Sequence, residues 1–104
     1  MKLSEEILKI KDAIISAVEV EKLYLFGSYA YGTPREDSDY DFYMVIPNGG
    51  MRPIDASTEA RLAVWDINKP MDILAATSER FAYRSQGLTM ERIVAEKGVV
   101  LYER

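Results

Sequence analysis

The spacing of hydrophobic residues changes several times along the chain, between the spacing typical of helices and that typical of strands. A first helix is expected after Ser4, which can cap it, because apolar residues recur every three or four positions from Ile7 to Val18. Short apolar runs bounded by charged residues, glycine or proline predict four strands, at 22–26, 39–46, 70–77 and 99–102. Helical patterns cover the remaining stretches at 53–65, from Thr77 or Ser78 to about Ser85, and at 89–97 before Gly98.

This order of elements predicts a two-layer α/β fold in which a small mixed β-sheet is flanked by helices. A helical crossover through 53–65 would make the strands at 39–46 and 70–77 parallel. Residues 1–104 are expected to form a single domain, since 104 residues suit one core and 48% of them are hydrophobic. Trp65 is expected to anchor that core.

A turn that can hold phosphate follows the first predicted strand. Gly27 has no Cβ, so it lets the backbone turn sharply and approach a ligand closely. Ser28 can cap a short helix through Ala30 or Tyr31, and the free N–H groups at a helix start can bind an anion.

Two carboxylates begin the second predicted strand, after a spacer of ten residues that follows Ser28. Asp39 and Asp41 lie on the same face of an alternating segment, so their Cα atoms are about 6.5–7 Å apart. At that spacing they can share one metal ion or bracket a pair of ions about 3.5–4 Å apart. Hard oxygen ligands favour Mg²⁺ or Mn²⁺ over zinc.

The same residues allow two other interpretations. Asp37, Asp39 and Asp41 fit positions 1, 3 and 5 of a calcium-binding EF-hand loop, but Phe42 stands where that loop needs glycine and Asn48 where it needs glutamate. The other alternative is a polar turn that leads into a strand, with solvated aspartates.

A third carboxylate, Asp72, lies within the otherwise apolar segment 70–77. A charged residue in such a segment is costly unless it is paired or binds metal, although it could also face water at a frayed strand end. If this strand lies beside the one that carries Asp39 and Asp41, Asp72 can act as general base for an attacking hydroxyl or as a third metal ligand.

Gly27-Ser28, the spacer, Asp39-x-Asp41 and the later Asp72 together resemble the minimal nucleotidyltransferases of the DNA polymerase β superfamily. Residues 25–42 carry most of the similarity, and 61–76 and 96–102 extend it over nearly the whole chain. The resemblance implies a polymerase β-like fold and Mg²⁺-dependent transfer of a nucleoside monophosphate from an NTP, usually ATP, to a hydroxyl. By that resemblance Asp39 and Asp41 match the metal ligands, Asp72 matches the third carboxylate, and Gly27 with Ser28 matches the phosphate-binding turn.

The chain departs from this family at Tyr31, where many members carry arginine. If that arginine helps to hold phosphate, another cation must replace it here. Arg35, Arg52 and Lys69 are the candidates, and each also fits a solvated surface charge. Tyr29 or Tyr31 could stack on a nucleotide base. Alternatively, the tyrosines between residues 24 and 43 have a structural role and fill the core and its rim.

Composition narrows the class of function. The formal net charge is −4 and there is no basic run, which argues against autonomous binding to DNA or RNA. Without cysteine or histidine, carboxylates must carry any catalysis. No apolar run is long enough to span a membrane and the N-terminus lacks a signal-peptide pattern, so the cytoplasm is the default location.

The acceptor of the nucleotide is expected to come from another protein, because no residues remain to build a second domain that would hold it. The resemblance implies the same, since such domains are often paired with a helical HEPN protein as antitoxin and toxin, the transferase attaching AMP to the toxin. Two further hypotheses remain: transfer to a small hydroxylated molecule such as an antibiotic, and a binding module that neutralises its partner by contact alone.

Overall fold

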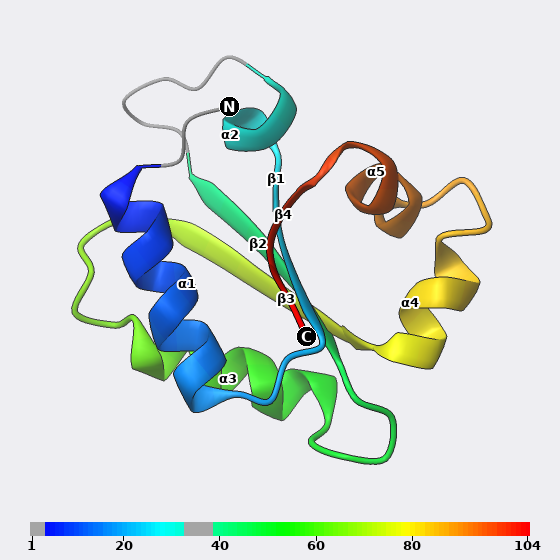
Figure 1. Ribbon diagram of the computed structural model, residues 1–104, viewed down its shortest axis with the longest axis horizontal. Helices are drawn as coiled ribbons and strands as arrows, with labels where there is room; N and C mark the ends of the chain where they lie inside the picture. The colour runs from blue at the N-terminus through cyan, green and yellow to red at the C-terminus, as the bar shows by residue number, and fades with distance from the viewer. Residues whose placement is uncertain (1–3, 33–38) are drawn as a thin grey trace.

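The computed structural model describes residues 4–32 and 39–104, and its elements follow the predicted order closely (Figure 1). Their bounds are α1 (Glu5–Ala17), β1 (Lys22–Phe26), α2 (Ser28–Tyr31), β2 (Tyr40–Ile46), α3 (Pro53–Ala63), β3 (Met71–Thr77), α4 (Ser78–Arg84), α5 (Met90–Lys97) and β4 (Val99–Glu103). The four strands are the predicted ones to within one residue at each end, because each is a short apolar run with clear boundaries.

The sheet has the strand order β3-β2-β1-β4. β1 is antiparallel to β2 and to β4, whereas β2 and β3 are parallel, which confirms the predicted mixed sheet and the crossover through α3. β1 therefore finishes at the end of the sheet where β2 and β3 begin. This end carries Asp39, Asp41 and Asp72 and is named the acidic end below.

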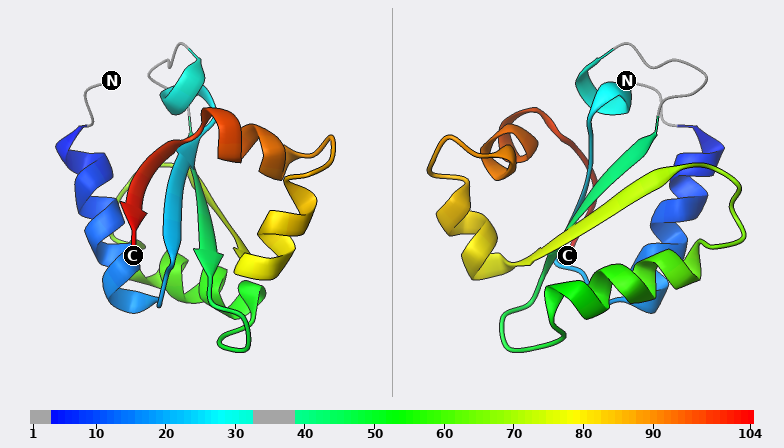
Figure 2. Two further views of the ribbon diagram at one scale, coloured as in Figure 1. Left: turned by 45° about the vertical axis from the view of Figure 1, so that its right-hand side comes forward. Right: turned by 180° about the vertical axis from the view of Figure 1, so that it is seen from behind.

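Helices cover both faces of the sheet (Figure 2). One core joins α1 and α3 to alternate residues of β2, namely Phe42, Met44 and Ile46. A second core joins α4 and α5 to the intervening residues, Tyr43 and Val45. The predicted fold class is confirmed, with the refinement that helix, sheet and helix make three layers instead of two. The reason is that β2 is buried on both faces from Phe42 to Ile46, a continuous run of large side chains.

α1 shows how the sequence specifies one of these layers. The Ser4 hydroxyl accepts a hydrogen bond of 3.1 Å from the Ile7 amide, which caps the helix as predicted. Ile7, Ile10 and Ile14 are all buried against the sheet. Burial of each isoleucine contributes roughly 1.5–3 kcal/mol.

The prediction that Trp65 anchors the core is wrong. α3 ends at Ala63, and Val64 takes the buried position, with 3% of its surface exposed. Trp65 follows in the turn after the helix and is 83% exposed. Among the tyrosines, Tyr24, Tyr40 and Tyr43 are buried in the two cores, in line with the core interpretation, while Tyr31 is 45% exposed.

Within residues 4–32 and 39–104, none of the helices combines the length and the hydropathy that a membrane crossing requires.

Candidate active site

Two carboxylates of neighbouring parallel strands lie side by side at the acidic end. Asp41 is the second residue of β2 and Asp72 the second of β3, and the two are direct partners in the strand register. Neighbouring strands lie about 4.8 Å apart, so the two Cα atoms are separated by about that distance. Because side chains alternate along a strand, both carboxylates project to the face that also carries Tyr43 and Leu74 and is covered by α4 and α5.

The electrostatics of Asp41 show that negative charge accumulates at this point. Partial burial raises the pKa of the Asp41 carboxyl above its usual value, and the charges of Asp72 and then Asp39 raise it further. Asp39 and Asp72 themselves are exposed. A bound cation would relieve this repulsion, and the available donors are the hard oxygens that Mg²⁺ prefers.

The carboxylates alone do not form a closed metal cage. Among residues 4–32 and 39–104, no three acidic side chains are grouped closely enough to hold a metal ion. The assignment of Asp39, Asp41 and Asp72 to one metal site therefore stays a prediction. Asp37, which the calcium-loop alternative needs, lies outside the described residues.

Gly27 packs directly against the Asp41 carboxylate. Its φ is 75°, in the region that favours glycine, and a Cβ added there would overlap Asp41 Oδ2 and lie 3.1 Å from Asp41 Cγ. Glycine is therefore needed at position 27 for two reasons: it can adopt the positive φ, and it has no Cβ to collide with the Asp41 carboxylate. The pairing of Phe26 with Asp41 brings the two together, because Gly27 follows Phe26.

The expectation that Ser28 caps the short helix is wrong. Gly27 is the N-cap of α2, and Ser28 is its first residue. The amides of Ala30 and Tyr31 both donate to the Gly27 carbonyl, at 3.0 and 3.1 Å. The positive φ of Gly27 turns the chain one residue earlier than a serine cap would. As a result the amides of Ser28 and Tyr29 belong to the first turn, where an α-helix offers no carbonyl partner.

The three cations proposed to replace the family arginine have different positions. Arg35 lies outside the described residues. Arg52 pairs with Asp55 at 2.9 Å and stands before α3, near the end of β2 that is remote from Asp41. Lys69 is close to the acidic end, but its Nζ donates to the Tyr29 hydroxyl at 3.1 Å and lies 5.0 Å from the centre of the Tyr40 ring, on the α1/α3 side of the sheet.

A polar network around Tyr40 fixes the backbone on which Asp41 is carried. The Tyr40 hydroxyl donates to Glu6 of α1 at 2.6 Å, and its amide donates to the Pro70 carbonyl at 3.1 Å. Burial, followed by the bond to Glu6, raises the pKa of Tyr40 to about 12, so it stays a donor at neutral pH. This role of Tyr40 could not be predicted, because nothing in the sequence links Glu6 to a strand that starts at Tyr40.

A second network ties α4 and α5 to the face that carries Asp41. The Tyr43 hydroxyl donates to Glu91 Oε2 at 2.9 Å, and Arg84 Nε donates to Glu91 Oε1 at 3.0 Å. Burial alone would raise the pKa of Glu91, but the bonds from Arg84 and Tyr43 outweigh it and hold that pKa below the usual value. Glu91 was missed as well, since a glutamate in an amphipathic helix normally faces water.

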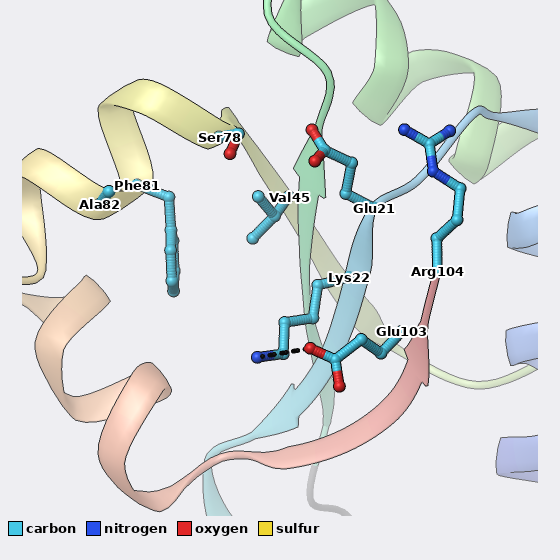
Figure 3. Close-up of a pocket in the computed structure, with 8 residues that line it drawn as sticks. All are labelled: Glu21, Lys22, Val45, Ser78, Phe81, Ala82, Glu103 and Arg104. Carbon is cyan, nitrogen blue, oxygen red and sulfur yellow. Dashed lines mark ion pairs between the residues drawn. The ribbon is translucent and has the colours of Figure 1, made fainter.

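A pocket of 280 Å³ lies at the opposite end of the sheet (Figure 3). It is bounded by Phe81 of α4 and by the ion pair between Lys22 and Glu103, whose atoms are 3.2 Å apart. Lys22 begins β1 and is the register partner of Val45 near the end of β2. This pocket is therefore separate from the acidic end.

Comparisons with known proteins agree with this geometry. The family model described as "Polymerase beta, Nucleotidyltransferase" matches residues 8–104. The curated proteins contain no match.

Solved structures share the fold over almost the whole chain. A toxin–antitoxin structure with AMP-PNP matches with a TM-score of 0.64 and 19% identity, over 97% of this chain and 75% of that chain. A mutant of the toxin–antitoxin MntA–HpeT, with two Asp-to-Glu substitutions, matches with a TM-score of 0.65 and 20% identity, over 98% and 75% of the two chains. A candidate nucleotidyltransferase from Sulfolobus solfataricus matches with a TM-score of 0.60 and 18% identity, over 94% of this chain and 78% of that chain.

Proposed function

Because this chain belongs to the polymerase β family of nucleotidyltransferases, we propose that it transfers AMP from ATP to a hydroxyl group with the help of Mg²⁺, for which Mn²⁺ could substitute. The observation that carries the proposal is the position of Asp41 beside Asp72 on parallel strands, with Gly27 packed on the Asp41 carboxylate. Carboxylate oxygens of the kind that bind Mg²⁺ and a turn of the kind that binds phosphate thereby lie close together, which supports the proposal. We also propose that residues 1–104 act as a single nucleotidyltransferase domain.

The residues at the acidic end fit a metal ion that is bound together with a nucleotide. Asp39 and Asp41 would hold it, with Asp72 as a possible third ligand. Bound Mg²⁺ would neutralise charge on the α-phosphate. Since Mg²⁺ commonly completes its coordination with phosphate oxygens and water, the open arrangement of the carboxylates suits binding of metal and triphosphate together, and metal alone should bind weakly.

The chain's own groups have separable tasks in the transfer. The amides of Ser28 and Tyr29, which have no carbonyl partner within the helix, would hold the phosphate tail and let pyrophosphate leave beside it. Asp72 would take the proton from the attacking hydroxyl, which then forms its bond to the α-phosphate as the bond to pyrophosphate breaks. Because Asp72 is exposed, an acceptor can reach it from solvent.

The favoured acceptor is a Tyr, Ser or Thr hydroxyl of a partner protein, a HEPN-type toxin that this chain would neutralise as antitoxin in the cytoplasm. Two structures with the same fold are described as toxin–antitoxin, one of them with AMP-PNP. The family resemblance to minimal nucleotidyltransferases supports the same acceptor.

The test uses the chain co-purified with its partner from the native host, incubated with Mg²⁺ and ATP labelled on the α-phosphate. Wild type should add label and the mass of one AMP to the partner. Asp41→Asn should abolish transfer, and Asp72→Ala should still bind ATP without modifying the partner. Asp66→Asn, which changes an exposed aspartate in the turn after α3, is the control and should transfer normally.

Other results would select the other functions. Label that appears only in a small molecule would indicate a small hydroxylated acceptor. Equal inhibition of the partner by wild type and by Asp72→Ala, without a change of mass, would indicate neutralisation by contact alone.

A further inference from the structure

The C-terminal end of α5 lies at the acidic end of the sheet. Val99, which begins β4, is the register partner of Leu25, two residues before Gly27. A Cβ added to Gly98 would lie 3.2 Å from Tyr24 Cδ1 and 3.4 Å from the Leu25 carbonyl oxygen. The end of α5 thus lies beside β1, and the left view of Figure 2 shows the junction of α5 with β4 below α2.

The side of α5 on which its last residue, Lys97, lies follows from the contacts of Glu91 and Val94. Val94 is fully buried against the sheet, whereas Lys97 is exposed. Glu91 contacts Arg84 of α4, and α4 begins at the far end of β3. At about 100° per residue, Glu91 and Lys97 flank Val94 by about 60° on opposite sides. Lys97 therefore lies on the side of α5 that faces away from α4.

Four groups then follow one another across this end of the sheet. Asp72 belongs to β3 and Asp41 to β2, Gly27 directly follows β1, and Lys97 lies two residues before β4. Strands about 4.8 Å apart make this row about 14 Å long. A metal held at Asp41 would leave the phosphate tail to run over Gly27 toward Lys97, whose flexible four-carbon stem ends in a point charge.

Lys97 also supplies a positive charge at a site that is otherwise acidic. The three aspartates repel a triphosphate, and Tyr31 stands where many family members carry arginine. Lys69 donates to Tyr29 and lies over Tyr40 on the opposite face of the sheet. Lys97 lies on the face of Asp41 and Asp72.

We propose that Lys97 binds the terminal phosphates of the nucleotide, beyond the Gly27-Ser28 turn. This inference rests on the proposed function and names a residue of the same site. The competing explanation is structural, since a lysine in the last turn of a helix interacts favourably with the helix dipole. Comparing the affinities for a triphosphate and a monophosphate separates the two explanations, because an interaction of Lys97 with the helix dipole does not distinguish these ligands.

The experiment measures binding of AMP-PNP and of AMP, each with Mg²⁺, by calorimetry. Lys97→Gln should lower the affinity for AMP-PNP at least about tenfold and change the affinity for AMP by less than about twofold. This difference is expected for the loss of a hydrogen bond to a charged group. Lys97→Arg should retain most of the affinity. Arg92→Gln is the matched control on the same helix, because Arg92 pairs with Glu96 at 3.1 Å on the outer side and should not affect either ligand.

The outcomes separate this inference from the proposed function. If wild type and Lys97→Gln bind AMP-PNP equally, or if Lys97→Gln weakens AMP-PNP and AMP by the same factor together with a lower melting temperature, the phosphate role is overturned while the proposed function stands. If wild type binds neither AMP-PNP nor its guanosine counterpart, the proposed function fails and the role of Lys97 fails with it.

Discussion

Replacing Gly27 by alanine tests the central contact of the site. The new methyl group would overlap the Asp41 carboxylate, and the backbone there has φ 75° and ψ −155°, a region almost confined to glycine. Such a backbone conformation costs about 1–3 kcal/mol for other residues, and overpacking costs another 1–3 kcal/mol. We therefore expect Gly27→Ala to lower the free energy of unfolding by about 2–6 kcal/mol.

The matched control is Gly49→Ala. Gly49 also has a positive φ, 77°, but a Cβ added there meets nothing within 4 Å. Gly49→Ala should lower the free energy of unfolding only by the cost of the backbone conformation, about 1–3 kcal/mol. Urea unfolding followed by circular dichroism measures both variants, and calorimetry with AMP-PNP and Mg²⁺ measures whether the site survives.

A double-mutant cycle isolates the contact itself. In an Asp41→Ala background the carboxylate is gone, so Gly27→Ala should cost about 1–3 kcal/mol less than it does in wild type. Equal losses from Gly27→Ala in both backgrounds, or equal losses at Gly27 and Gly49, would refute the idea that this glycine makes room for the carboxylate.

Three further predictions concern Asp41, Glu91 and Trp65. Asp41→Asn should leave the free energy of unfolding unchanged or raise it by up to about 1 kcal/mol, because it removes a partly buried charge that Asp72 and Asp39 repel; a large loss on urea unfolding would contradict this. The folded-state pKa of Glu91 lies below its usual 4.5, so its stabilising contribution should be present above that pH and lost as the pH falls further. Glu91→Gln should therefore flatten the dependence of stability on pH below about 4.5 while costing about 1–3 kcal/mol at neutral pH, and an unchanged acid profile would argue against it. Trp65→Ala should change stability by no more than about 0.5 kcal/mol, and acrylamide should readily quench the fluorescence of this single tryptophan; weak quenching would show that it is buried.

The strands and the register of the site could be predicted because their signals are local. Alternation along 39–46 placed Asp41 and Tyr43 on one face, and a crossover helix of ordinary length required parallel strands. The pairing of Asp41 with Asp72 follows from those two facts. The third layer was missed because Asp39 and Asp41 begin one of the two sets of alternating side chains and suggest an exposed face, although Tyr43 and Val45 of the same set are buried.

Other features depend on contacts that the sequence does not encode locally. Trp65 was expected in the core because of its size, but the helix phase gives the buried position to Val64. Ser28 was expected to cap α2 from residue preference alone, whereas Gly27, whose positive φ turns the chain, takes the cap position. The position of Lys97 depends on α5 crossing the sheet face, which no periodicity predicts.

The parallel pairing of β2 with β3 also has a consequence for folding kinetics. Asp41 and Asp72 are 31 positions apart in the chain, counted from their residue numbers, and they meet only when the intervening segment with α3 returns the chain to the sheet. Closing such a loop costs entropy before the strand contacts compensate for it, so non-local parallel pairing is intrinsically slow. A chain still emerging from the ribosome before β3 is complete would therefore lack the pairing of Asp41 with Asp72. Nucleotide binding should appear abruptly during refolding, in step with the last long-range contacts and not with the earlier gain of helix.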